Sequence, residues 1–252
     1  MATRRNRPRY EPDDLLGLVL SAPLLWPGRT VRLERDSLLD CMGRSASAQV
    51  SVAELYHENS KLNRAHLPEL VHTAVDAARF RQEFLRRKRL AAQGADGEDS
   101  GDSSSIRPLL ETACADEPEL FYAIELRLVT GADVYAYEPA AATFRLVKRL
   151  ASHQIDELAA ALGLMEPAHP SAGNLAYVLV LGCFPRNEIL LGPRGYRRTL
   201  LEAGRIAAAV VREARRLGRR PAVRYEFDDR EVDRLMEVDG VEESVVVAVE
   251  LD

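Results

Sequence analysis

The stretch that decides the fold is RRTLLEAGRIAAAVVREARRL, residues 197–217. Its apolar residues recur every three or four positions, so they gather on one broad face of a helix. These residues are Leu200, Leu201, Ala203, Ile206, Ala207, Val210, Val211 and Ala214. Gly218 follows directly, and glycine commonly ends a helix because it adopts the left-handed backbone conformation. We therefore predict a long helix over residues 197–217, with an apolar face broad enough to serve both a core and an interface.

Segments with strand-like patterns lie on both sides of this helix. The predicted strands are 121–129, 133–137, 143–148, 176–181, 222–227 and 245–251. Residues 138–142 suit a hairpin turn between the second and third of them. Two short helices are predicted, 153–162 with Ser152 as its N-cap and 228–236. Strands with helices between them predict an α+β domain in which helices flank a mixed sheet.

The N-terminal part of the chain has a different pattern. Residues 68–92 carry an apolar stripe and end in basic residues, which suits a long helix. Residues 93–105 are acidic and contain no large apolar side chain. Such a segment cannot offset its ordering entropy by burial, so it is predicted to be a flexible linker. The sequence thus divides into an N-terminal extension (1–92), an acidic linker (93–105) and one folded domain (106–252).

Composition excludes several classes of function. The chain has 252 residues, 46% of them hydrophobic, and a net charge of −5, which argues against general nucleic-acid binding. Its basic runs at 86–89 and 215–220 are interpreted as solvated helix faces; binding of phosphate or an acidic partner is the minority interpretation. The cysteines Cys41, Cys114 and Cys183 form no metal-binding spacing and suit a reducing cytoplasm. No segment is long and apolar enough to span a bilayer, so no membrane association is predicted.

Three pieces of the chain, in the same order, are similar to one enzyme family. They are YHENSKL at 56–62, residues 119–147 with the turn GADVYAYEP at 131–139, and the stretch 176–252 with its Gly-Tyr-Arg and Phe-Asp-Asp segments. In these pieces the chain resembles the nitroreductase-like flavoproteins, and among them the SagB-type dehydrogenases. The resemblance implies a nitroreductase-like fold, FMN as cofactor, and oxidation of azolines to azoles in ribosomally made peptides. It also implies two-fold dimers with flavin sites at the shared interface.

The residues that the resemblance implies for FMN binding are largely missing. An Arg-Ser-x-Arg segment that binds the phosphate is expected between residues 62 and 121, where the chain has only the basic helix and the acidic linker. Arg44-Ser45 lies upstream of YHENSKL and is out of order. A Pro-Ser-Ala-Gly segment is expected before the strand at 121. It occurs instead at 170–173, where it is interpreted as a turn.

The positions implied for catalysis also differ. A Lys-Tyr pair that transfers a proton in this family aligns with Leu190 and Leu191, and leucine has no proton to exchange. The two small residues expected before Phe-Asp-Asp are Tyr225 and Glu226, which would crowd a flavin ring. We therefore name no catalytic residue.

What remains of the family's site is Gly195-Tyr196-Arg197. Tyr196 and Arg197 are the candidate cofactor-binding residues; the alternatives are a helix N-terminus with a structural tyrosine and a contact at a dimer interface. His57 and Glu58 are adjacent, so they would not face each other on a helix, and they are not assigned a catalytic role.

These observations favour a degenerate SagB-type subunit of an azole-forming complex. It would act as a partner or scaffold, as a homodimer or paired with an intact homologue whose flavin site it completes. FMN would bind only in such a shared site or in a divergent one, and a precursor peptide is a further possible partner. The alternatives are an active FMN-dependent azoline dehydrogenase with divergent motifs, and a peptide-binding module built on residues 56–89.

Overall fold

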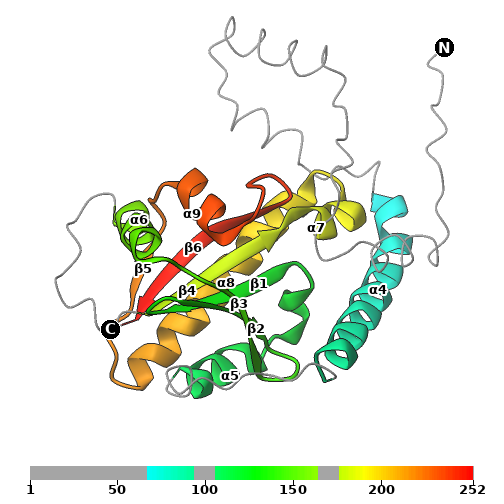
Figure 1. Cartoon of the computed structure of the whole chain (residues 1–252). Coiled ribbons are helices and arrows are strands. Elements are labelled where there is room, and N and C mark those ends of the chain that lie inside the picture. Colours follow the sequence, from blue (N-terminus) through cyan, green and yellow to red (C-terminus); the bar gives the residue numbers. More distant parts are fainter. Residues whose placement is uncertain (1–66, 94–105, 164–175, 252) are drawn as a thin grey trace, which may run out of the picture. The chain divides into compact units, whose positions relative to one another are not determined.

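The computed structural model describes residues 67–93, 106–163 and 176–251 (Figure 1). Residues 85–252 belong to one compact unit. Its helices are α5 (Arg107–Ala115), α6 (Ser152–Leu162), α7 (Phe184–Leu191), α8 (Arg194–Arg216), α9 (Asp229–Met236) and the short 3-10 helix η2 (Pro118–Tyr122). Its strands are β1 (Ile124–Thr130), β2 (Asp133–Glu138), β3 (Thr143–Arg149), β4 (Ala176–Cys183), β5 (Ala222–Arg224) and β6 (Glu243–Leu251). Helix α4 (Leu67–Gln93) precedes them.

The six strands form one sheet in the order β3-β2-β1-β4-β6-β5. The predicted α+β architecture with flanking helices is confirmed. Every pairing in this sheet is antiparallel, however, so the expectation of mixed pairing is corrected. The reason is that β1–β3 form a meander with short turns, and the later strands enter the sheet in alternating directions.

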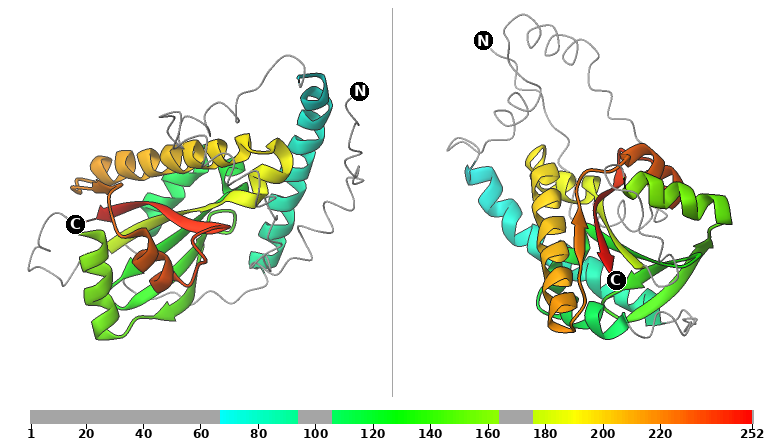
Figure 2. Two further views of the ribbon diagram at one scale, coloured as in Figure 1. Left: turned by 90° about the horizontal axis from the view of Figure 1, so that it is seen from above. Right: turned by 90° about the vertical axis from the view of Figure 1, so that its left-hand side faces the viewer.

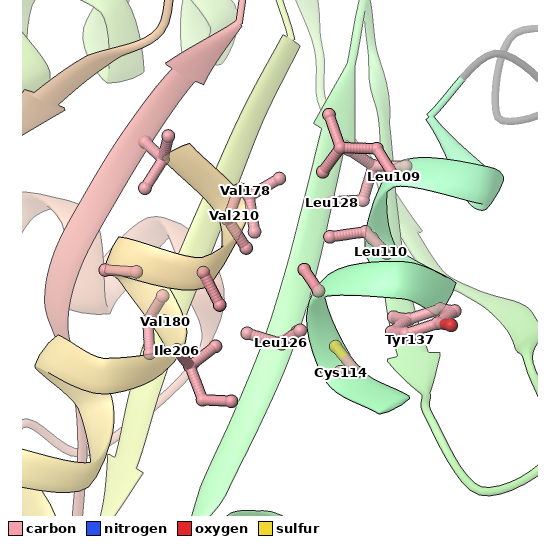
Figure 3. Packing of buried hydrophobic residues seen from close by; sticks show 14 of the residues in the cluster. Leu109, Leu110, Cys114, Leu126, Leu128, Tyr137, Val178, Val180, Ile206 and Val210 are labelled. Carbon is pink, nitrogen blue, oxygen red and sulfur yellow. The ribbon is translucent and has the colours of Figure 1, made fainter. Parts of the chain in front are cut away.

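Helices cover both faces of the sheet (Figure 2). Helices α5 and α8 pack on one face, with Ile206 and Val210 of α8 beside Val178 and Val180 of β4 (Figure 3). Helices α6 and α9 pack on the other face, over a second apolar cluster that includes Leu158. Successive strand residues point to opposite faces, so each central strand contributes to both clusters.

The long helix predicted at 197–217 is confirmed and begins three residues earlier. Gly218 has φ +80°, as expected of the residue that ends it. The predicted strand at 121 begins only at Ile124, because residues 118–122 form η2. Ser152 is the first residue of α6 and not its cap. The cap is Ala151, whose backbone N–H donates to the Gln154 side chain at 3.0 Å.

Two α-helices were not predicted. Both α5 and α7 are short and carry a proline in their first turn, a recognised helix-start signal. Strand β5 ends at Arg224, three residues earlier than expected, and Asp228 caps α9 by accepting from the backbone N–H of Glu231.

The helix predicted at 68–92 corresponds to α4. The YHENSKL segment, residues 44–45 and the turn at 170–173 lie outside the described residues, as does the acidic linker except for Gln93. Within the part of the chain that is described, no helix is long and apolar enough to cross a membrane.

Candidate functional site

Tyr196 and Arg197 lie in the first turns of α8, directly after the corner that joins it to α7. The Tyr196 ring stacks on Phe184, with 4.6 Å between ring centroids and 21° between planes, and remains partly exposed. Arg197 is half-buried. Gly195 packs so closely that an added Cβ would lie 2.3 Å from the backbone nitrogen of Glu188. The glycine of the Gly-Tyr-Arg segment is therefore required for the packing of α7 against α8.

A buried polar network fixes this corner. The Asn187 side-chain amide donates to Thr199 Oγ1 at 3.0 Å and to Glu202 Oε2 at 2.8 Å. Glu202 also accepts from Arg198 Nε at 2.5 Å, and Thr199 Oγ1 donates to the carbonyl of Gly195 at 3.1 Å. Buried polar groups that satisfy one another hold a single arrangement. The network thus fixes the backbone positions of Tyr196 and Arg197 at the start of α8.

The positions expected to transfer protons carry no ionisable group. Leu190 is buried at the end of α7 and Leu191 is half-buried beside it. Tyr225 follows β5 and is 70% exposed, and Glu226 next to it is also exposed. Phe227 is buried with the α6–α9 cluster, so the Phe-Asp-Asp segment serves packing and helix capping.

A cluster of partly buried charges lies at the other end of α7, where sequence reasoning placed no site. Arg186 Nη2 donates to Glu125 Oε1 of β1 at 2.9 Å. Lys88 Nζ lies 4.0 Å from Glu125 and 3.2 Å from Glu138, and Arg127 Nη1 lies 3.6 Å from Glu125. Burial by itself raises the pKa of Glu125, but these three cations outweigh it and lower the pKa to about 2. Glu125 is therefore ionised and held by its cations.

Cys183 and Glu243 lie beside Glu125, and one ligand atom from each of the three falls within 4.8 Å of the others. Burial is the main reason that the pKa of Cys183 is raised, and burial followed by the Glu125 charge raises that of Glu243. A metal ion would have to displace the cations that already neutralise Glu125. We interpret the cluster as an ion-pair centre.

The charge cluster does not suit the phosphate of the flavin that the resemblance implies. Phosphate binding needs an arginine or lysine that can face the ligand. The cations of the charge cluster, Lys88, Arg127 and Arg186, already face glutamates. Lys88 was expected to be solvated and is instead half-buried in this cluster. The signal that sequence reasoning missed is the pair of charges, Glu125 and Arg127, inside an apolar strand.

The outer face of α8 combines arginine with exposed apolar residues. Leu201 is 70% exposed and Leu200 40% exposed. The only acidic residues of the helix, Glu202 and Glu213, are buried. Arginine is therefore the only charged residue type that α8 presents to solvent, as expected for the basic run at its end.

Comparisons with known proteins show the fold. No sequence family matches the chain, and no curated protein is significantly similar to it in sequence. The structure is similar to a chain of the Escherichia coli microcin synthetase McbBCD complex with truncated pro-MccB17 bound, at 20% identity and a TM-score of 0.50. The match covers 63% of this chain and 69% of that one. Because the identity is low, this likeness establishes the shared fold.

Two further solved structures are similar to part of the chain. One, from Anabaena variabilis and assigned as a nitroreductase, is 20% identical with a TM-score of 0.45, over 53% of this chain and 28% of that one. The other, from Ralstonia eutropha and assigned likewise, is 14% identical with a TM-score of 0.44, over 62% and 74%.

Proposed function

We propose that this chain is a non-catalytic, nitroreductase-like subunit of a complex that forms azoles in a ribosomally made peptide. It acts as a partner or scaffold, and together with an intact SagB-type dehydrogenase it completes that enzyme's flavin site. It works in the cytoplasm, a compartment that suits the free thiols of Cys114 and Cys183.

One observation carries the proposal. Where proton transfer is expected, the chain has the buried side chain of Leu190 and its neighbour Leu191. Leucine cannot act as a general acid or base, so this chain alone lacks the chemistry of an azoline oxidase. The partly buried cations at the other end of α7 support the same conclusion, because Arg186 and Lys88 are held by glutamates and are not presented to a phosphate.

The shared fold supports a role in a complex. The E. coli protein of similar structure is part of a synthetase seen with a truncated precursor bound. By analogy of fold, we place the present chain among subunits that assemble with others around a peptide. In that setting Tyr196 and Arg197, fixed by the α7–α8 corner, are the residues offered to a shared flavin site, and α8 supplies the contact between subunits.

Titration of FMN tests the proposal. Bound oxidised flavin absorbs light at about 450 nm, so its uptake is seen directly. We expect no submicromolar binding by the chain alone, and uptake when it is mixed with an intact SagB-type dehydrogenase that binds FMN poorly by itself. Arg197→Ala should lower the uptake by the mixture, whereas Arg145→Ala on β3 should not.

Submicromolar FMN binding by the isolated chain, with oxidation of an azoline peptide, would overturn the proposal. It would establish the alternative, an FMN-dependent azoline dehydrogenase with divergent motifs. Absence of flavin uptake and of any association in the mixture would refute the shared site.

A further inference from the structure

Helix α8 carries an exposed stripe of small and apolar side chains, which we call the α8 stripe: Leu201, Gly204 and Ala208. These residues are spaced three and four apart, so they lie on one line along the helix. All three are exposed, and Leu201 is 70% exposed. An exposed leucine next to two small residues offers a partner helix an apolar contact and room for close approach.

No contact within the described part of this chain requires a glycine at position 204. A Cβ built on it meets nothing within 4 Å, and it lies in the middle of a 23-residue helix. Glycine at an exposed helix interior is less favourable than alanine by about 1 kcal/mol. By contrast, Gly195 of the same helix is required by the backbone of α7. The missing side chain at Gly204 is explained if the backbone of a partner approaches there.

The charges around the stripe are mainly positive. The arginines of α8 are Arg194, Arg197, Arg198, Arg205, Arg212, Arg215 and Arg216. Its two glutamates are buried: Glu202 binds Asn187 and Arg198, and Glu213 binds Arg216. Arg205 and Arg212 border the stripe, and more than half of each side chain is exposed. Arg205 pairs with Glu117, and Arg212 lies 3.7 Å from Glu213, so both bordering arginines have a carboxylate partner within the chain. The seven arginines of α8 still outnumber the three glutamates that pair with them, so the face carries a net positive charge.

This charge pattern discriminates between partners. A two-fold contact uses the same patch on both subunits, so a second copy would place arginines against arginines. Centred on Gly204, it would bring the two Arg205 side chains together near the axis. Like charges across an interface oppose association, whereas an acidic surface would be attracted. A nucleic acid would use the arginines but leave the apolar stripe unexplained.

From the stripe and its charges, we infer that the outer face of α8 docks a helix of a different protein, one whose apolar seam is bordered by aspartate and glutamate. This inference rests on the proposed function, because it specifies the subunit contact that the proposal assigns to α8. Of the two assemblies considered from the sequence, a homodimer and a heterodimer, it selects the heterodimer.

A synthetic helical peptide with a Leu/Ala seam bordered by glutamate serves as the probe, and its fluorescence anisotropy is measured with the full chain. We expect binding that weakens as salt is added. Arg205→Ala with Arg212→Ala should weaken it about tenfold. Gly204→Leu should abolish it, and Ala208→Leu provides a second block of the stripe. The matched control, Arg145→Ala with Arg230→Ala, removes the same charge elsewhere and should change nothing.

The other outcomes contradict the inference. A peptide with lysine at every glutamate position should not bind; equal binding would show that charge does not select the partner. Failure of the acidic peptide to bind, or equal binding by Gly204→Leu, would remove α8 as the surface. Self-association of the chain that excludes the peptide would assign the face to a second copy, and competition by duplex DNA would assign it to phosphate. The assay uses neither flavin nor homologue, so its failure is separate from failure of the FMN titration.

Discussion

Glu125 on β1 and Arg186 on α7 form a largely buried ion pair, with Arg186 Nη2 donating to Glu125 Oε1 at 2.9 Å. Arg186 is fixed further by Tyr122, because its Nη1 donates to the Tyr122 carbonyl at 3.2 Å and the Tyr122 hydroxyl donates to the Arg186 carbonyl at 2.8 Å. The pair therefore ties α7, and with it the α7–α8 corner, to the sheet.

Replacing Glu125 by glutamine should destabilise the fold by about 3–5 kcal/mol at neutral pH, because it leaves Lys88, Arg127 and Arg186 gathered around a neutral amide. Urea denaturation measures the loss. Glu119→Gln, at an exposed position of η2, is the control and should change stability by less than about 0.5 kcal/mol. A loss for Glu125→Gln no greater than the control's would show that the pair contributes little.

The same pair predicts a dependence on acid. Burial raises the pKa of Glu125, but Lys88, Arg186 and Arg127 lower it to about 2, against about 4.3 in an unfolded chain. A carboxyl group whose pKa is lowered by folding contributes stability above the unfolded pKa and loses it as the pH falls toward the folded one. Between about pH 5 and 2, the wild type should therefore lose more stability than Glu125→Gln. Parallel urea midpoints for the two proteins over this range would refute the assignment.

Glu243 should behave in the opposite way. Its pKa is raised, first by burial and then by the Glu125 charge, despite Arg127 and Arg186. When folding raises the pKa of a carboxyl group, the ionised group lowers the free energy of unfolding. This destabilisation is present above the folded pKa and is absent in acid, where the group is protonated in both states. We expect Glu243→Gln to stabilise the protein at pH 7 and to match the wild type near pH 4. Destabilisation at pH 7 would mean that its hydrogen bond from Cys183 matters more than its buried charge.

Local patterns account for what the sequence predicted correctly. The period of residues 197–217 determines α8 without reference to other segments, and Gly218 marks its end. The same pattern placed Leu201 on a broad apolar face, yet Leu201 is exposed and the neighbouring Glu202 is buried. Burial of Glu202 depends on Asn187 of α7, which periodicity within α8 cannot show.

The candidate site was less predictable for the same reason. Glu125 and Arg186 meet because β1 pairs with β4 and α7 follows β4, a contact between residues 61 positions apart. Tyr196 and Arg197 were predicted as site residues, and the structure places them at a fixed corner; their binding of a cofactor stays a prediction. A short helix such as α7, with few periodic positions, gave no signal strong enough to place that corner.

The buried thiols should be unreactive in the native protein. Burial raises the pKa of Cys114 to about 12 and that of Cys183 well above its usual range, and the reactive form of a cysteine is its thiolate. With Cys41 replaced by serine, we expect almost no reaction with a thiol reagent at pH 8 until denaturant is added, when both thiols react. Rapid labelling of the folded variant would contradict the burial of one or both.

Two glycines of α8 should respond oppositely to the same substitution. Gly195→Ala would place a Cβ within 2.3 to 2.5 Å of the Asn187 and Glu188 backbone, so the helices must separate. We expect a loss of about 1–3 kcal/mol or more, as for other overpacked sites. Gly204→Ala meets nothing within 4 Å and removes the entropic disadvantage of glycine, so it should stabilise the isolated chain by about 0.5–1 kcal/mol. Urea denaturation of both variants measures this difference in sign. Destabilisation by Gly204→Ala would show that Gly204 is needed within the chain itself and would remove the reason for expecting a partner at that position.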